Sequence, residues 1–265
     1  MKIEHDFHIH TNLSYCAKKD ATAEHYIATA KKLGLKKIGF SDHFWDDTIE
    51  GANGFYQGQN YEHVALLKAE LERVPKEGVT IYFGCETEYD PAHHGAAITE
   101  ETAEKFDYIL VPNSHTHMMM PKELYQPYQK HADFMIQAYH EILDCRISKY
   151  VTAMAHPFAA VCCPYDNNIL INLISDDCFK RLFDKTAGKK VAVEINTACI
   201  NQLTDEQLAE CAQMRMFRLA KECGCKFLFG SDSHSIDAHQ SYLHLTKLVS
   251  EILELSEDDI AGIAI

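Results

Sequence analysis

The sequence of 265 residues lacks the features of an exported or membrane-bound chain. Its N-terminus has no basic segment followed by an apolar run and a small-residue cleavage site, so we expect no signal peptide. No apolar stretch approaches the roughly 20 residues that a membrane helix needs. An excess of basic residues is also missing, because 25 lysines and arginines stand against 39 acidic residues. We therefore expect a cytoplasmic protein that binds no membrane and does not have nucleic acid as its main partner.

Paired cysteine motifs are missing as well, although the chain has ten cysteines. Cys162 and Cys163 are adjacent, and one residue separates Cys223 from Cys225, so neither pair has the Cys-x-x-Cys spacing of a structural zinc site. A chain of this length without an export signal is expected to keep its thiols reduced. We expect most of the cysteines to be small residues of the core.

Short apolar or β-branched runs recur along the chain and alternate with stretches of helical periodicity. This alternation predicts parallel strands joined by crossover helices, in a barrel or in a doubly wound sheet. Thr99 and Thr204, each followed by acidic residues, have the pattern of helix N-caps, and Gly34 and Gly224 that of helix C-termini. No linker or repeat divides the chain, so we expect one domain over 1–265. The seven predicted strands are 3–9, 37–41, 79–85, 108–112, 150–155, 191–195 and 226–230.

Side chains that can bind metal ions cluster directly after these strands. In a parallel α/β fold the C-terminal ends of the strands lie on one face, where the active site is built. Alternate residues of a strand point the same way, so His8 and His10 can supply two ligands to one ion. A mixture of imidazoles and carboxylates suits borderline divalent metals. The later groups are Asp42 and His43, Glu86 and Glu88, His115 and His117, His156, Glu194 and Asn196, and Asp232 and His234.

Each of these groups also has a structural interpretation. A single histidine after a strand is more often a hydrogen-bonded structural group than a ligand, and His-x-His alone leaves both interpretations open. One shared site nevertheless explains all the groups more simply than separate structural roles. The segment 44–61 is the most loop-like part of the chain and a candidate lid. The histidines on expected helices or surfaces are interpreted as structural or solvated: His5, His25, His63, His131, His140, His239 and His244.

Taken in order, the motifs resemble those of the PHP (polymerase and histidinol phosphatase) superfamily over almost the whole chain. The resemblance implies a distorted seven-stranded (β/α)7 barrel of the TIM type with a metal site at the C-terminal strand ends. That architecture agrees with the seven strands counted from the sequence. The matching motifs are His-x-His-Thr at 8–11, Ser-Asp-His at 41–43, Gly-x-Glu at 84–86, Ser-His at 114–115, Ala-His-Pro at 155–157 and Gly-Ser-Asp-Ser-His at 230–234.

The resemblance also implies two or three divalent metal ions, either zinc, manganese or iron. At the third site, where family members often add a histidine, this chain has Cys16. The Cys16 thiolate or Asp20 could complete that site, the site could be weak or empty, and Cys16 could equally be a buried thiol without a function. The implied ligand sets are His8, His10, Glu86 and Asp232 for the first ion, Glu86, His115 and His156 for the second, and His43 and His234 for the third.

The activity implied by the resemblance is hydrolysis of a small phosphate monoester by a metal-bridging hydroxide, with L-histidinol phosphate as the leading substrate. Asp232 and His117 are the candidate catalytic groups, Asp232 as ligand and proton carrier and His117 as the reserve general acid. Alternative substrates are nucleotides or other small phosphate esters, including phosphodiesters. A non-catalytic metal-binding protein is a further alternative, and a C–N hydrolase is disfavoured because Glu86 stands where such enzymes often have a bridging lysine. The oligomeric state stays open.

Other polar residues are expected to play supporting parts. Glu88 could orient a ligand, because strand alternation places it on the same side as Glu86. Asp6 is expected to support the opening histidines rather than bind metal. Glu194 and Asn196 are expected to be polar residues that fill the barrel. Three lysines, which are more often simply solvated, could meet the substrate phosphate: Lys18, Lys19 and Lys122.

Overall fold

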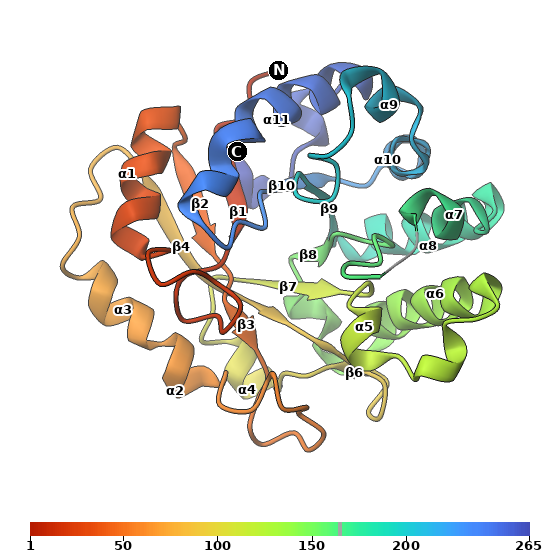
Figure 1. Cartoon of the computed structure of the whole chain (residues 1–265), viewed down its shortest axis with the longest axis horizontal. Helices are drawn as coiled ribbons and strands as arrows, with labels where there is room; N and C mark the ends of the chain where they lie inside the picture. The colour runs from red at the N-terminus through yellow and green to blue at the C-terminus, as the bar shows by residue number, and fades with distance from the viewer. Residues whose placement is uncertain (164–165) are drawn as a thin grey trace.

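Seven parallel strands form the centre of the computed structural model, which describes residues 1–163 and 166–265. Neighbouring strands pair in the order β1-β2-β4-β7-β8-β9-β10. The two ends of this sheet approach each other, because Ile9 forms a parallel bridge with Ser233 and the His10 amide donates to the Ser233 carbonyl at 2.9 Å. The sheet is thus nearly closed into a barrel, with helices around it (Figure 1). The strands are β1 (His5–Ile9), β2 (Lys37–Phe40), β4 (Thr80–Thr87), β7 (Tyr108–Pro112), β8 (Ala153–Ala155), β9 (Ala192–Asn196) and β10 (Phe227–Gly230).

All seven strands expected from the sequence are present. Of the two architectures that the sequence left open, the structure has the barrel and not the doubly wound sheet. Three short strands were not predicted. The two-residue β3 (His43–Phe44) pairs in parallel with β4, and β5 (Tyr89–Asp90) forms an antiparallel hairpin with β6 (Gly95–Ala96). Strands of two residues are too short to produce an alternating pattern, so the sequence carries no signal for them.

The helices lie outside the strands and bury one face each. In α1 the buried residues Tyr26, Ile27 and Ala30 have helical spacing. The expected helix ends are confirmed: Thr99 and Thr204 cap α4 and α9, Gly34 closes α1 with φ of 71°, and Gly224 follows α10. The helices are α1 (Ala23–Leu33), α2 (Tyr61–Val64), α3 (Leu66–Leu71), α4 (Glu100–Ala103), α5 (Thr116–Met119), α6 (Tyr128–Asp144), α7 (Asn167–Asn172), α8 (Asp176–Lys189), α9 (Asp205–Glu210), α10 (Ala212–Glu222) and α11 (Tyr242–Ile252).

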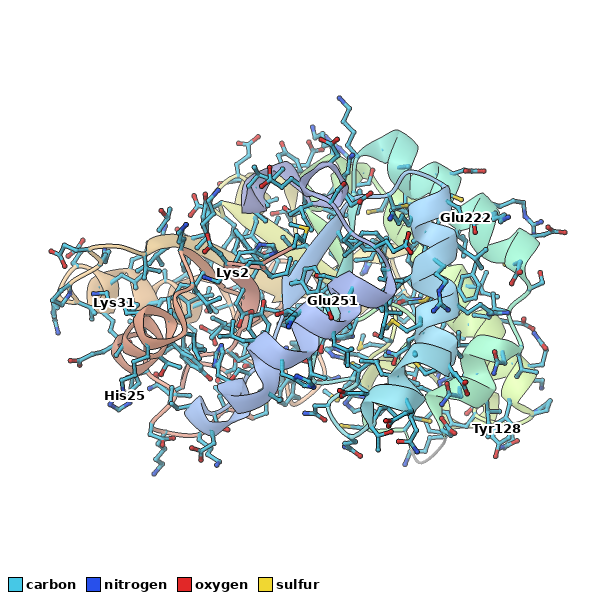
Figure 2. The ribbon with its side chains drawn as sticks, turned by 90° about the horizontal axis from the view of Figure 1, so that it is seen from above. Lys2, His25, Lys31, Tyr128, Glu222 and Glu251 are labelled. Carbon is cyan, nitrogen blue, oxygen red and sulfur yellow. The ribbon has the colours of Figure 1, made fainter. Side chains whose placement is uncertain are left out.

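Short 3-10 helices complete the connections, and charged side chains cover the outer surface. Figure 2 shows α10 and α11 on one side of the molecule, with Glu222 and Glu251 projecting from it. None of the described helices is long and apolar enough to cross a membrane. The 3-10 helices are η1 (Lys122–Leu124), η2 (Arg146–Tyr150), η3 (Ile236–Ser241), η4 (Glu257–Asp259) and η5 (Gly262–Ala264).

Tyr108 fills much of the barrel interior below the strand ends. A Cβ atom at Gly39 would lie 2.4 Å from the Tyr108 hydroxyl, and one at Gly84 would lie 2.2 Å from its ring. The neighbouring strands β2 and β4 therefore carry glycine at the positions where the Tyr108 side chain of β7 fills the space. Phe7 packs on the same ring at right angles, with centroids 5.2 Å apart. This packed layer supports the polar cluster above it.

The cysteines do not form the buried set that we expected. The ten cysteines, all among the described residues, form no disulfide, which agrees with reduced thiols, but only Cys85, Cys211 and Cys225 are buried. Cys16 and Cys162 are exposed, so the interpretation of Cys16 as a buried thiol is wrong. The difference arises because several cysteines lie in loops and near helix ends, where the sequence pattern does not report burial.

Candidate metal centre

Four ligand atoms converge at the ends of β1, β4 and β10. His8 Nε2 lies 3.0 Å from His10 Nε2, 3.5 Å from Glu86 Oε2 and 3.6 Å from Asp232 Oδ1. His10 Nε2 lies 3.6 Å from Glu86 Oε2 and 3.3 Å from Asp232 Oδ1. Ligands held about 2.1 Å from a tetrahedral zinc ion are about 3.4 Å apart. The spacing of these atoms therefore fits one ion enclosed by the four side chains.

The second oxygen of Glu86 faces a different pair of histidines. Glu86 Oε1 lies 3.0 Å from His156 Nε2 and 3.9 Å from His115 Nε2. Its Oε2 atom instead faces His8, His10 and also His43, whose Nδ1 is 3.0 Å away. The carboxylate is buried, with 1% of its surface exposed, and it lies between two sets of imidazoles. This is the placement that a carboxylate bridging two ions requires.

A third group consists of His10, His43 and His234, which have ligand atoms within 4.8 Å of one another. The His10 ring lies 4.2 Å from that of His234 and 4.3 Å from that of His43. Neither Cys16 nor Asp20 belongs to any of the three-residue groups found in the described part of the chain. Cys16 lines the adjacent cavity, whereas Asp20 is exposed and its carbonyl oxygen accepts a hydrogen bond from His25.

Two buried atoms at the centre of the cluster have no hydrogen-bond partner. They are His43 Nδ1 and Glu86 Oε2, which lie 3.0 Å apart but do not form a hydrogen bond with each other. Leaving a buried polar atom unpaired costs about 1–3 kcal/mol, so native proteins rarely do so without a function. A divalent cation would satisfy both atoms and offset the clustered carboxylates. The donor set and its geometry therefore fit metal ions of the zinc, manganese or iron type.

Four of the six candidate ligand imidazoles are oriented by a partner on their far side. His8 Nδ1 lies 2.6 Å from Glu194 Oε1, and His115 Nδ1 lies 2.8 Å from Glu88 Oε2. Glu88 thus has the contact expected of an orienting residue. Such partners fix the ring tautomer and raise the basicity of a ligand. The remaining two pairs are His156 Nδ1 with Ser114 Oγ at 2.6 Å and His10 Nδ1 with Ser14 Oγ at 3.1 Å.

Glu194 is more than the barrel filler that the sequence suggested. Its second oxygen accepts from the His156 amide and, at 3.3 Å, from Asn196 Nδ2, which also donates to Asp232 Oδ2 at 3.3 Å. Gly230 makes room for it, because a Cβ atom there would lie 2.1 Å from Glu194 Oε1. Glu194 therefore contacts two candidate ligands, namely the ring of His8 and the backbone amide of His156.

Asp6 supports the cluster from below, as expected, but through the backbone. Its Oδ1 atom accepts from the amides of His8 at 3.1 Å and Ser231 at 2.9 Å. Its Oδ2 atom lies 2.8 Å from Nε2 of the buried His239. Asp6 thus connects β1 to the loop after β10, and this loop carries Asp232 directly after Ser231. His239, His5 and the other histidines interpreted as structural lie outside the candidate ligand groups of the described residues.

Backbone strain occurs at two of the candidate ligands. His156 has φ of 24° and Asp232 has φ of 53°, in the left-handed region that residues with a Cβ atom rarely adopt. Each such conformation costs on the order of 1–3 kcal/mol and persists where the surroundings impose it. The Asp232 amide is held by the His8 carbonyl at 2.7 Å, and the His156 amide by Glu194. The strain aims both side chains into the cluster.

The cluster stabilises charged carboxylates. Burial raises the pKa of Glu86, but the imidazoles of His8 and His115 outweigh it and hold this pKa well below its usual range. Burial is likewise outweighed at Asp232, where His8 and His10 keep the pKa low. At His115 burial lowers the pKa, yet Glu88 and Glu86 raise it to about 9. Anionic carboxylates and basic imidazoles in one buried space form a cation-binding environment.

A cavity of about 310 Å³ opens onto the cluster. His43, His115, Asp232 and His234 line it together with His117, whose pKa is lowered by burial and by the neighbouring His115. The rest of its lining consists of Cys16, Phe55, Tyr56, Met118, Val161 and Cys162. His117 thus lies at the rim of the site, where a substrate could meet it.

The segment expected to be a loop, 44–61, is irregular between the end of β3 at Phe44 and the start of α2 at Tyr61, and it supplies part of this wall. The Phe55 ring lies 5.3 Å from that of His43, and the Tyr56 hydroxyl donates to Glu88 Oε2 at 2.6 Å. Tyr56 was not among the residues singled out from the sequence, since an aromatic residue in a loop carries no distinguishing pattern. The role of this loop as a lid stays a prediction.

A second cavity of about 360 Å³ lies beside the first and shares Val161, Cys162 and Asp232 with it. Polar side chains dominate its wall, among them Asn168, Gln202 and Gln213. No lysine or arginine is among the described residues that line either cavity. The three lysines considered for phosphate binding are exposed and lie outside both linings: Lys18, Lys19 and Lys122.

Comparison with known proteins gives a match to a family and several similar solved structures, two of which are histidinol phosphatases by name. The model of the PHP domain matches residues 6–198. The histidinol phosphate phosphatase of Lactococcus lactis subsp. lactis Il1403, solved with zinc, L-histidinol and phosphate, has a TM-score of 0.68 at 16% identity, covering 94% of this chain and 93% of that one. A candidate histidinol phosphatase from Listeria monocytogenes has a TM-score of 0.66 at 13% identity, covering 89% and 97%. No curated protein sequence matches the chain. At these identities the likeness establishes a shared fold.

Proposed function

The chain belongs to the PHP domain family, and from that premise we propose that it is a metal-dependent phosphatase that hydrolyses a small phosphate monoester. The observation that carries the proposal is the central place of Glu86. One of its oxygens faces His8 and His10, and the other faces His156. A carboxylate placed in this way can hold two divalent ions side by side, the arrangement used for in-line displacement at phosphorus.

The ligand sets that we propose follow these contacts. His8, His10, Glu86 and Asp232 would hold one ion, and Glu86, His115 and His156 a second. Because His10 Nδ1 faces Ser14, only its Nε2 atom is free to bind an ion. If that atom serves the first ion, His43 and His234 remain for a third, with Cys16 as a further candidate. Bound divalent ions would lower the pKa of water and neutralise phosphoryl charge.

Two side chains are placed to move protons. Asp232 uses Oδ1 toward the histidines, while its Oδ2 accepts from Asn196. We propose that it holds the nucleophilic water and accepts a proton from it. His117 lies at the cavity rim, where burial and the neighbouring His115 lower its pKa, so its protonated form is a stronger acid that is less populated at neutral pH. We propose that this form donates its proton to the leaving oxygen.

The two cavities support a leaving group without negative charge. Their described linings offer no lysine or arginine, and outside the metal cluster they include the carboxylate of Asp166. A second phosphate or a carboxylate would therefore enter without a compensating cation. L-Histidinol phosphate, with its imidazole and amino group, satisfies this condition, and we propose it as the substrate. The solved complex of the Lactococcus protein with L-histidinol and phosphate supports this choice. A nucleotide monophosphate or another small ester is the second candidate.

The test is phosphate release by protein reconstituted with zinc or manganese. The panel contains histidinol phosphate, p-nitrophenyl phosphate, its bis-ester, nucleoside monophosphates and glycerol phosphate. We expect histidinol phosphate to have the highest kcat/KM, and Glu86→Ala and Asp232→Ala to lose both metal and turnover. Glu251→Ala, an exposed substitution on α11, is the control and should match the unaltered protein. If the protein holds less than one metal ion per chain and releases no phosphate from any ester, the proposal is wrong.

A further inference from the structure

Ser14 occupies a position that the ligand motifs do not explain. It is 1% exposed and lies in the turn after β1, where its amide donates to the Thr11 carbonyl at 3.0 Å. Its hydroxyl has three polar neighbours. Asp42 Oδ1 is 2.6 Å away, the His43 backbone nitrogen 3.1 Å and His10 Nδ1 3.1 Å. Residues from two different strand ends thus meet at one oxygen atom.

The direction of each of these hydrogen bonds can be assigned by counting protons. Asp42 accepts from the Thr11 amide at Oδ1 and from the Thr11 hydroxyl at Oδ2, each at 2.7 Å, and donors on both oxygens favour the ionised carboxylate. The proton between Ser14 and Asp42 therefore belongs to the serine, which has only one to donate. The His43 amide can only donate. The second lone pair of the hydroxyl is left for His10, whose Nδ1 must carry a proton.

This assignment fixes the chemical form of His10. With Nδ1 protonated, the lone pair of the neutral ring lies on Nε2, which is the atom 3.0 Å from His8 Nε2 and 3.3 Å from Asp232 Oδ1. The same hydroxyl holds the backbone of His43, whose ring lies 4.3 Å from that of His10. One serine therefore sets both the tautomer of one candidate ligand and the distance to the next.

We propose that Ser14, held by Asp42, is a positioning residue that joins the first group of candidate ligands to the third. This inference rests on the proposed metal centre but does not depend on which ester is hydrolysed. Thr11 completes the device, since its hydroxyl donates to Asp42 Oδ2 at 2.7 Å and keeps the carboxylate from rotating. Partners of this kind change metal affinity about 10- to 100-fold when they are removed.

The first test needs no variant. Long-range ¹H–¹⁵N correlation spectra of labelled protein report the tautomer of each histidine, with His10 assigned by its loss in His10→Gln. We expect the Nδ1–H tautomer in the metal-free protein and in the zinc-loaded protein. An Nε2–H tautomer of His10 in the metal-free protein would overturn the proposal.

The second test compares two buried serines. Ser14→Ala and Ser250→Ala each remove a hydroxyl that donates one short hydrogen bond, but Ser250 Oγ donates to the Thr246 carbonyl within α11, away from the cluster. Zinc affinity is measured by competition with a chromophoric chelator. We expect it to fall 10- to 100-fold in Ser14→Ala only. Equal affinities in the two variants would refute a positioning role and leave Ser14 a structural residue of its turn.

These readouts separate the inference from the proposed function. If the unaltered protein binds zinc but hydrolyses no ester, the phosphatase proposal fails while both tests of Ser14 can still be read. If Ser14→Ala does not fold, the tautomer of His10 in the unaltered protein decides.

Discussion

Replacing Glu194 by glutamine tests whether this buried carboxylate supports the metal cluster. The substitution keeps the size and shape of the side chain and removes its charge. In the native protein both oxygens accept hydrogen bonds, one from His8 Nδ1 and the other from the His156 amide. A glutamine has only one acceptor oxygen, so its amino group must point at one of these two donors. Either orientation leaves a buried donor without a partner.

The expected magnitude follows from this count. An unsatisfied buried donor costs about 1–3 kcal/mol, so the free energy of unfolding should fall by that amount in the metal-free protein. If the glutamine turns its amino group toward His8, the ring loses the carboxylate that raises its pKa and basicity. Zinc affinity should then fall about 10- to 100-fold, which corresponds to about 1.4–2.7 kcal/mol.

The assay combines chelator competition for zinc with urea unfolding in the absence of metal. Glu251→Gln is the matched control, because it removes the same charge from an exposed position on α11 (Figure 2). It should change neither quantity beyond about 0.5 kcal/mol. The reasoning is refuted if Glu194→Gln binds zinc within twofold of the unaltered protein and unfolds at the same urea concentration.

Three further predictions concern packing, pH and metal. Gly84→Ala should destabilise the fold by about 1–3 kcal/mol in urea unfolding, because its Cβ would lie 2.2 Å from the Tyr108 ring; an unchanged midpoint would contradict this packing. Burial lowers the pKa of His5 to about 4 in the folded protein, where its Nε2 accepts a hydrogen bond from the Phe229 amide. As the pH falls below about 6.5, His5 of the unfolded chain therefore binds a proton while His5 of the folded protein does not. The metal-free protein should thus lose up to about 3 kcal/mol between pH 6.5 and 4, and His5→Gln should reduce that slope. Removing zinc with a chelator should lower Tm, since free zinc at 100 times its Kd stabilises by about 2.7 kcal/mol; identical Tm values with and without zinc would contradict a metal centre.

The fold and the residues around the cluster were open to prediction for a physical reason. Strands long enough to show alternation and helices with capping threonines leave local patterns, and the parallel arrangement then brings all seven strand ends to one face. Ligand-type residues placed after the strands had to converge. The two-residue strand β3 left no such pattern, although it places His43 beside Glu86.

The supporting partners of the cluster could not be predicted in the same way. Ser14 and Ser114 are small polar residues whose hydroxyls matter only because distant segments fold against them. Glu194 did leave a signal, a charged residue inside the apolar strand β9, since a fully buried carboxylate needs a partner. Its partner, His8, is 186 positions away in the sequence, and only the closed barrel brings the two together.

Cys16 distinguishes the third group of candidate ligands from the other two. The first two groups contain the carboxylates of Glu86 and Asp232, whereas His43 and His234 bring no negative charge. The Cys16 residue is exposed overall, but its thiol is partly shielded from solvent, which raises the pKa to about 12, and Glu86 adds to the effect. The thiol therefore does not supply a negative charge in the metal-free protein. An ion with two neutral ligands is held less tightly than one with two carboxylates. We therefore expect zinc titration in a calorimeter to fill the third position last and with the lowest affinity. Cys16→His, which adds an imidazole at this position, should raise that last affinity and leave the earlier steps unchanged. A single class of equal sites, unaffected by this substitution, would refute the distinction.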